Sequence, residues 1–328
     1  MIGIDIGSRF IKACTLSIRE GEAPIVNYAI KELAEQTPEK VSGAIQELTN
    51  KLWETTGKKE INMAAGIGSH EVLFRSIEFP EMPEEELRSS LKLQAEQYIY
   101  SDISDMEVDF NVLERMEESN KLKILISAAP KKEISEKVCA IQNAGFYAPV
   151  VDVDTLALIN AFTTLRPSTL EESAVFVCCG DKYTNYTIMN KGKYCFAKNM
   201  AYGGSSLTAT IAEELGITPT KAEEIKRDPK LWESAGLNIS TILRKSTPDL
   251  IETLHRSVEF CRGQRMITNI ENIYITGGAT LLPGFIEFIA DVFGGEIQPW
   301  NPLAEISGIG APPEGMLLAV ALGLALRR

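Results

Sequence analysis

The stretch IGIDIGSRFIK, residues 2–12, combines the pattern of a buried strand with a polar glycine turn. Its alternating isoleucines predict a strand, which runs into a turn containing Asp5, Gly7 and Ser8 and returns toward Lys12. An isolated Asp-x-Gly-Ser is most often only a tight hairpin turn. The same turn also suits a phosphate site, because a Gly- and Ser-rich hairpin points several backbone N–H groups at one spot. The rest of the chain decides between these two interpretations.

The second half of the chain repeats this pattern. From residue 174 it reads AVFVCCGDKYTNYTIMNKGKYCFAKNMAYGG, which again has an apolar strand, a Gly-polar turn and two further strands leading toward a helix. Two such units predict two similar domains that face one another. We therefore expect an α/β fold with a cleft lined by the first turn of each half.

Length and composition agree with this organisation. A chain of 328 residues suits two domains of about 150 residues each. The net charge of −12 disfavours nucleic acid as a partner, since a phosphate-backbone surface needs clustered Lys and Arg. We expect no secretory signal, because no basic region precedes an apolar stretch near residue 1, and no membrane span, because the longest apolar run, residues 316–326, is too short. Six cysteines without C-x-x-C spacing disfavour a zinc site.

One part of the first half has no counterpart in the second. Residues 78–147 have the pattern of a helix, two strands joined by a polar turn, and a helix, which predicts an inserted α/β subdomain. Farther along, Thr220 and Glu223 predict a capping box at a helix start. The expected division of the chain is a first domain of residues 1–77, 148–168 and a C-terminal helix 315–328, the insert, and a second domain of residues 169–314 with a helical subdomain at about 205–270.

A nucleotide can be held by a P-loop, by a dinucleotide-binding glycine turn, or by paired hairpin turns from two domains. No G-x-x-x-x-G-K-[ST] is present, which excludes the first. GIGAPPEG, residues 308–315, contains two prolines and cannot open a helix as the second requires. The paired turns remain. Asp5 on the incoming strand can hold a hydrated magnesium ion, and Lys12 on the returning strand can reach the same phosphates.

Several motifs resemble those of the actin-like ATPases. The pattern Asp-x-Gly-Ser-x-x-x-Lys of residues 5–12 resembles their first phosphate motif. YITGGATLLPGF, residues 274–285, resembles their adenosine motif, and AEEIK, residues 222–226, resembles the segment that borders the adenosine in bacterial members. The resemblance implies ATP and Mg²⁺ as ligands. The nucleotide-binding residues that it implies are Asp5, Gly7, Ser8, Lys12, Gly180, Asp181, Thr184, Gly203, Gly204, Glu223, Lys226, Gly277, Gly278 and Ala279.

The second phosphate turn departs from the family pattern. It normally reads Asp-x-Gly, but the matching stretch here is CCGDKYT, so Cys178 stands where the second acidic residue is expected. A thiol cannot replace a carboxylate as a ligand of a hard cation. Asp181, three positions on, is the candidate to compensate, which makes Asp5 and Asp181 the expected metal ligands. Asp154, in VDVDTLA, matches the water-orienting residue of the superfamily and is the candidate catalytic residue.

Longer segments resemble the PilM family, the actin-like cytoplasmic components of type IV pilus machines. The resemblance covers essentially the whole chain and is carried by FPEMPEEELRSSLKLQAEQYIYSDISDMEVDF, AAPKKEISEKVCAIQNAGFYAPVVDVDTLAL, WNPL and LLAVALGLALRR. It implies a two-domain actin-like ATPase fold with an inserted subdomain placed as in FtsA. It also implies a partner, the N-terminal cytoplasmic segment of the membrane protein PilN, gripped between the first domain and the insert. The protein would then be cytoplasmic and peripheral to the inner membrane only through that partner.

Efficient phosphoryl transfer needs metal-neutralised phosphates, so the loss of one acidic residue predicts slow or absent ATP hydrolysis. Two alternatives stay open. A small-molecule kinase of the same superfamily would use Asp154 as its only candidate base. An FtsA-like filament former would self-associate and carry a membrane-anchoring tail, but the Ala- and Gly-rich C-terminal segment predicts a core helix. For Leu87, Leu91 and Tyr98, a place in a core is favoured over one in a peptide groove.

Overall fold

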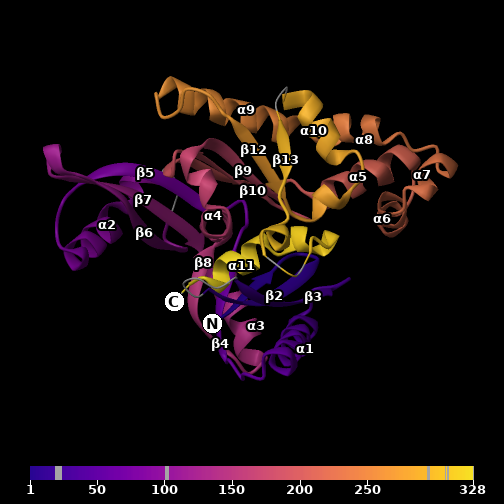
Figure 1. The fold of residues 1–328 in the computed structure, drawn as a ribbon, viewed down its shortest axis with the longest axis horizontal. Coiled ribbons are helices and arrows are strands. Elements are labelled where there is room, and N and C mark those ends of the chain that lie inside the picture. Colours follow the sequence, from indigo (N-terminus) through magenta and orange to yellow (C-terminus); the bar gives the residue numbers. More distant parts are fainter. Residues whose placement is uncertain (19–23, 100–102, 294–295, 307, 309, 328) are drawn as a thin grey trace.

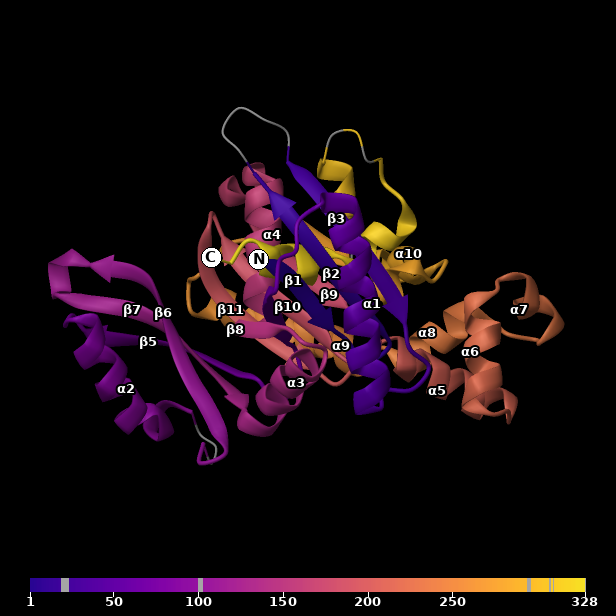
Figure 2. The ribbon, with the colours of Figure 1, turned by 90° about the horizontal axis from the view of Figure 1, so that it is seen from below.

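The computed structural model describes residues 1–18, 24–99, 103–293, 296–306, 308 and 310–327. Their strands form three sheets, two of which are the centres of the two halves predicted from the sequence (Figure 1). The third sheet lies in a lobe that projects from one side of the molecule (Figure 2). Short 3₁₀ helices connect some of the elements: η1 (Glu117–Ser119), η2 (Pro167–Glu171), η3 (Gly278–Leu281), η4 (Pro302–Glu305) and η5 (Pro313–Leu317).

The first sheet has the order β3-β2-β1-β4-β8. Its central strand β1 pairs antiparallel with β2 and parallel with β4. Helices α1 and α3 cover one face, and α4 and α11 cover the other (Figure 1). The bounds of these elements are β1 (Ile2–Ile6), β2 (Phe10–Ser17), β3 (Ile25–Glu32), β4 (Asn62–Ile67), β8 (Tyr147–Val153), α1 (Pro38–Thr56), α3 (Lys131–Asn143), α4 (Asp154–Leu165) and α11 (Ala319–Ala325).

Local sequence signals set the limits of α1. Thr37 accepts a hydrogen bond from the backbone N–H of Lys40, and Pro38 occupies the first helical turn, where its missing N–H costs nothing. Gly57 ends the helix in the left-handed conformation, with φ of 66°. Because the apolar residues of α1 recur at helical spacing, its buried side chains form one stripe that packs on the sheet: Val41, Ala44, Ile45, Leu48 and Leu52.

The second sheet repeats the pairing of the first. Its order is β11-β10-β9-β12-β13, and its central strand β9 pairs antiparallel with β10 and parallel with β12. The predicted repeat is therefore confirmed. The elements of this half are β9 (Ser173–Cys179), β10 (Thr184–Asn190), β11 (Lys193–Met200), β12 (Asn272–Thr276), β13 (Ile297–Pro299), α5 (Gly204–Leu215), α6 (Pro219–Arg227), α7 (Lys230–Ser234), α8 (Ile239–Ser246), α9 (Pro248–Gly263) and α10 (Phe285–Phe293).

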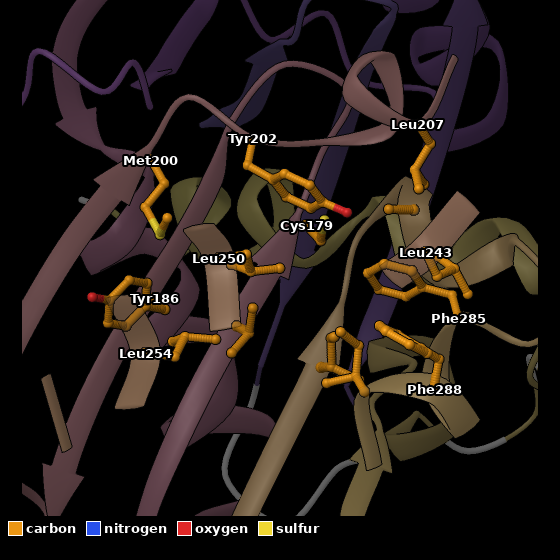
Figure 3. Close-up of a cluster of buried hydrophobic side chains, with 14 of the residues drawn as sticks. Cys179, Tyr186, Met200, Tyr202, Leu207, Leu243, Leu250, Leu254, Phe285 and Phe288 are labelled. Atoms are coloured by element: carbon orange, nitrogen blue, oxygen red, sulfur yellow. The ribbon is translucent and has the colours of Figure 1, made fainter. Parts of the chain in front are cut away.

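A large apolar core joins this sheet to its helices. Figure 3 shows Tyr186 of β10 near Leu250 and Leu254 of α9. Leu207 of α5, Leu243 of α8 and Phe285 of α10 group on the other side of Cys179. All of these side chains are buried. The polar end of Tyr186 shares a hydrogen bond of 2.6 Å with Ser257 Oγ of α9, which satisfies the one polar group that this ring buries. The core fixes the strand ends on which the second turn is mounted.

The third sheet forms the inserted lobe. It has the order β5-β7-β6 and consists of β5 (Leu73–Pro80), β6 (Met106–Met116) and β7 (Lys121–Pro130), with α2 (Glu84–Tyr98) beside it. β5 begins at Leu73, ahead of residue 78, where the sequence placed the start of the insert. Leu87 and Leu91 are buried against the sheet, and Tyr98 packs edge-on to Phe79, so the predicted core position of α2 is confirmed.

The final helix α11 is entirely buried, which confirms the predicted core helix. It packs so closely on α4 that a Cβ on Gly323 would lie 1.8 Å from the carbonyl oxygen of Ala157. Gly3 of β1 faces the same helix, and a Cβ there would lie 2.0 Å from the carbonyl oxygen of Ala321. Among the residues that the structure describes, no helix is long and apolar enough to cross a membrane.

Candidate functional site

The first turn is built on the hairpin of β1 and β2. Asp5 lies directly opposite Lys12 in the strand register, and their side chains form an ion pair with 2.6 Å between Nζ and Oδ2. The turn closes through a hydrogen bond from the N–H of Gly7 to the carbonyl of Phe10. A Cβ on Gly7 would lie 2.9 Å from Lys12 Nζ, so glycine keeps this space free for the lysine.

The second turn follows β9 and lies opposite the first. Gly180 donates its N–H to the carbonyl of Tyr183, and the side chain of Asp181 accepts a hydrogen bond of 2.9 Å from Ser8 Oγ. The two residues of this bond come from opposite halves of the chain. The prediction that the first turn of each half lines one cleft is therefore confirmed.

The cleft between the halves has a volume of about 1620 Å³. Most residues named from the sequence lie on its wall: Asp5, Gly7, Ser8, Lys12, Asp154, Gly180, Asp181, Gly204, Glu223, Lys226, Gly277, Gly278 and Ala279. Thr184 and Gly203 do not. Thr184 is buried behind the second turn, where its hydroxyl donates to the carbonyl of Tyr202, and Gly203 leaves no room for a Cβ beside the carbonyl of Asp181. These two residues support the turn from behind.

The segment that resembles the adenosine motif and the segment that resembles its border both line the cleft. After β12 the chain turns at Gly277 with φ of 96°, and a Cβ there would lie 2.4 Å from the carbonyl oxygen of Cys179. Lys226 of α6 is buried and donates to the carbonyl of Gly204, at 2.9 Å, while pairing with Glu223 at 2.7 Å. Burial lowers the pKa of Lys226, although the Glu223 carboxylate opposes that shift.

An ion-pair network crosses the mouth of the cleft near Glu223. Arg9 from the first turn contacts both Glu32 of β3 and Glu223 of α6, each at 2.8 Å. Arg227 of α6 reaches back to Glu32 with two hydrogen bonds, of 2.6 and 3.2 Å. Burial alone would raise the pKa of Glu32, but hydrogen bonds from Arg227 and Arg9 outweigh it and lower the pKa. The network holds the two halves together on this side.

Asp154 is the first residue of α4 and lies on the cleft floor. Its carboxylate fills the space above two glycines, since a Cβ on Gly66 or Gly68 would lie 2.2 or 2.0 Å from one of its oxygens. Oδ1 is buried and has no hydrogen-bond partner among the described residues. Burial and the Asp5 carboxylate raise the pKa of Asp154 to about 7, while the charges on Lys137 and Lys12 oppose that shift. An unpartnered buried oxygen facing a cleft fits a bound polar ligand.

Cys178 lines the cleft as the departure from the family pattern predicts. Burial, followed by the Asp5 carboxylate, raises the pKa of this thiol well above its ordinary value, so it stays neutral. Among the described residues, no three His, Cys, Asp or Glu side chains cluster as a metal site would require. Magnesium is commonly held by one or two carboxylates plus phosphate oxygens and water, which the pair Asp5 and Asp181 can provide.

Lys137 is a cleft residue that was not predicted from the sequence. This side chain of α3 donates to the carbonyl of Gly66 at 2.7 Å and to that of Ile6 at 3.2 Å, and it also lines the cleft. The ion-pair network of Arg9, Glu32 and Arg227 was not predicted from the sequence either. The cation at residue 137 lies in a segment quoted for its family resemblance, but no motif or spacing connects it with the phosphate turns.

Comparisons with known proteins agree with this geometry. A solved structure of a PilM-PilN type IV pilus biogenesis complex matches with a TM-score of 0.82 and 22% identity, over 99% of this chain and 97% of that chain. The ethanolamine utilization protein EutJ from Carboxydothermus hydrogenoformans matches with a TM-score of 0.59 and 17% identity, over 99% and 88%. The fold is thus the actin-like ATPase fold. The family model for the type IV pilus assembly protein PilM matches residues 3–328, and the chain belongs to that family.

Proposed function

We propose that this protein is an ATP-binding scaffold of a type IV pilus assembly platform, with slow or absent hydrolysis. The observation that carries the proposal is the hydrogen bond from Ser8 to Asp181, because it brings two phosphate-type turns from separate domains to one cleft. Two domains that close on a ligand make its binding sensitive to their relative position. Such a cleft suits a protein whose contacts with a partner depend on which nucleotide is bound.

The residues present fit MgATP. The backbone of the two turns and the ammonium of Lys12 would contact phosphate oxygens, and Asp5 and Asp181 would hold the metal. Gly277, Gly278 and Ala279 lie on the cleft wall, where their backbone would contact adenosine. Magnesium, when bound, would neutralise phosphate charge. Lys12 already pairs with Asp5 at 2.6 Å, so the cation is held at the site before a ligand arrives.

Two features support weak hydrolysis. The neutral thiol of Cys178 adds no negative charge for the metal where the superfamily has a carboxylate. With its pKa raised to about 7, Asp154 is partly protonated at neutral pH and is a poorer acceptor for a water proton. Neither feature prevents binding, since the phosphate contacts come mainly from the turns and Lys12.

For the partner, we propose the N-terminal cytoplasmic segment of a PilN-type membrane protein. The matching solved structure is of a PilM-PilN complex. The cleft in this chain extends beyond the phosphate turns to a space between α1 and α3, lined by Gln36, Pro38, Val41, Cys139, Ala140 and Asn143. That space joins the first domain to the end of the insert and suits an extended peptide. The protein would then be cytoplasmic and peripheral to the inner membrane through this partner alone.

Calorimetric titration tests the proposal. We expect the purified protein to bind MgATP at micromolar to millimolar concentration, and a peptide from the PilN N-terminus to bind independently of the phosphate turns. Hydrolysis should stay near the background rate over hours. A protein that binds no adenine nucleotide at millimolar MgATP would contradict the nucleotide half. A peptide that fails to bind with and without nucleotide would contradict the partner half.

A further inference from the structure

Lys137 holds an unusual position for a lysine of the inserted segment. Its ammonium lies at the carboxyl ends of the parallel strands β1 and β4, where it donates hydrogen bonds to two main-chain carbonyls, of Ile6 and Gly66. Glu133, one turn earlier on α3, lies 4.0 Å away. The side chain is only 16% exposed. Ligands of α/β proteins bind at the carboxyl ends of parallel strands, so this ammonium lies where a ligand is expected.

An ammonium has three N–H donors. Within the described residues, Lys137 uses two of them, on Gly66 and Ile6, and the third has no hydrogen-bond acceptor. The side chain lines the cleft together with Asp5, Lys12 and Asp154. A partly buried cation with a free donor at the wall of a cleft is suited to an anionic oxygen.

The position of α3 indicates which part of a nucleotide would meet this donor. In Figure 2, α3 lies on the side of α1 that faces the inserted lobe, whereas α5 and α6 lie on the other side. The adenosine-type segment of α6 and the helix α3 thus lie on opposite sides of α1. The phosphate turn contacts both, since Lys137 of α3 donates to the carbonyl of Ile6 and Arg9 pairs with Glu223 of α6. If the adenosine of ATP lies beside α6 and its phosphates follow the turn, the terminal phosphate lies toward Lys137.

We propose that Lys137 binds the terminal phosphate of ATP and makes the inserted lobe sensitive to whether that phosphate is present. This inference rests on the proposed nucleotide function. Lys137 is carried by α3, which follows β7 directly and packs against β4 and β8 of the first domain. A phosphate bound to this ammonium would share it with the carbonyls of Ile6 and Gly66 at the strand ends. Because ADP lacks the terminal phosphate, α3 would be next to a negative charge with ATP but not with ADP. The helix connects the phosphate end of the cleft to the central strand of the inserted sheet.

The matched control is Lys132 on the same helix. It also lines the cleft, but its side chain is 87% exposed and pairs only loosely with Glu136, at 3.9 Å. Lys132→Met changes the net charge of α3 by the same amount as Lys137→Met, but it keeps the donor of Lys137 at the cleft wall. Lys137→Arg keeps the charge and serves as the conservative variant.

The test compares ATP and ADP affinities, both with Mg²⁺, by calorimetry for the wild type, Lys137→Met, Lys137→Arg and Lys132→Met. For Lys137→Met we expect ATP affinity to fall by on the order of ten- to a hundredfold and ADP affinity by less than about threefold. Lys132→Met should keep the wild-type ratio, and Lys137→Arg should retain part of the preference for ATP. Because the ratio is taken within one variant, partial unfolding cannot imitate the result.

Hydrogen exchange supplies a second readout. Peptides covering α3 should be more protected with a non-hydrolysable ATP analogue than with ADP in the wild type, and this difference should vanish in Lys137→Met. A wild type that binds both nucleotides while Lys137→Met leaves the ATP-to-ADP ratio unchanged would overturn this inference and leave the proposed function intact. A wild type that binds neither nucleotide would overturn both.

Discussion

Ser8 and Asp181 are joined by a hydrogen bond of 2.9 Å although 173 positions separate them in the chain. Each belongs to the turn that follows the central strand of its own sheet, β1 or β9. Because both strands sit between an antiparallel and a parallel neighbour, the two turns have the same place in their domains. Their hydrogen bond therefore shows that the two halves meet at these equivalent turns.

Replacing Lys12 separates its structural role from its proposed ligand role. Lys12→Met leaves the buried Asp5 carboxylate without its 2.6 Å partner, so we expect the free energy of unfolding to fall by about 3 kcal/mol. The double variant Asp5→Asn/Lys12→Met should recover much of that loss, since no charge is left unpaired. MgATP binding should be lost in both variants. Urea denaturation and calorimetry measure the two effects, and a double variant that binds MgATP like the wild type would refute the assignment of Lys12.

The raised pKa of Asp154 predicts a pH dependence of stability. An acid whose pKa rises from 3.8 to about 7 on folding binds more protons in the folded state between these values. The free energy of unfolding is therefore lowered progressively as the pH rises from about 4 to about 7. Asp154→Asn removes this penalty. In EDTA and without nucleotide, the variant should exceed the wild type by a few kcal/mol at most at pH 8, and by about half of that or less at pH 5.

Denaturation at both pH values measures that difference. A gap between Asp154→Asn and the wild type that stays constant from pH 5 to pH 8 would mean that Asp154 does not titrate in this range.

Local pattern was enough to predict the strands that carry the two turns. The hairpin of residues 2–12 has a strand period that can be read from its isoleucines, and the spacing from Asp5 to Lys12 brings them opposite each other. The core position of α11 also followed from its small residues, which allow the approach of Gly323 to α4. Both features could be predicted because they depend on residues close together in sequence, or on the composition of a single segment.

Other features could not be read from local pattern. The capping box predicted at Thr220 is wrong, because Pro219 fixes the first turn of α6 and Thr218 accepts the hydrogen bond from the N–H of Lys221. Lys137 was missed because its acceptors, on Ile6 and Gly66, approach it only after α3 has packed on the first sheet. No recurring spacing in the sequence predicts such contacts between distant segments.

Two glycine substitutions test the packing of the final helix. Gly323→Ala would bring a methyl group within 1.8 Å of the Ala157 carbonyl oxygen, so α11 must move and stability should fall by about 3 kcal/mol or more. Gly43→Ala is the control, because nothing lies within 4 Å of a Cβ at this exposed position inside α1. It should gain about 0.5–1 kcal/mol. Thermal unfolding of both variants measures the contrast, and equal melting temperatures would contradict the close contact of α11 with α4.

The ion-pair network predicts an effect on the opening of the cleft rather than on folding. Glu32→Gln weakens its contacts with Arg9 and Arg227, which are partly exposed, so the loss of stability should stay below about 1 kcal/mol. Dissociation of a fluorescent ATP analogue should accelerate by about fivefold, because the network joins the two halves. Glu35→Gln is the control, since Glu35 pairs with Lys40 outside the cleft wall. Stopped-flow dissociation rates that are equal for the two variants would exclude a role of the network in closure.

The remaining prediction concerns the acidic residue that this chain lacks. In Cys178→Asp a carboxylate would join Asp5 and Asp154 at the cleft floor, where the three negative charges would repel one another without a cation. We therefore expect Cys178→Asp to be less stable than the wild type in EDTA and to regain stability with Mg²⁺ and ATP. A restored metal ligand should also raise the rate of ATP hydrolysis by on the order of tenfold or more.

Cys178→Ser is the control for this gain, because it is close in size to the wild type and adds no charge. Phosphate release under saturating MgATP measures hydrolysis in the two variants, after calorimetry has established that both bind the nucleotide. If Cys178→Asp hydrolyses ATP no faster than Cys178→Ser, the slow turnover must arise elsewhere at the site. Asp154 would then be the group to replace next, since its raised pKa is the other feature that weakens the acceptor for a water proton.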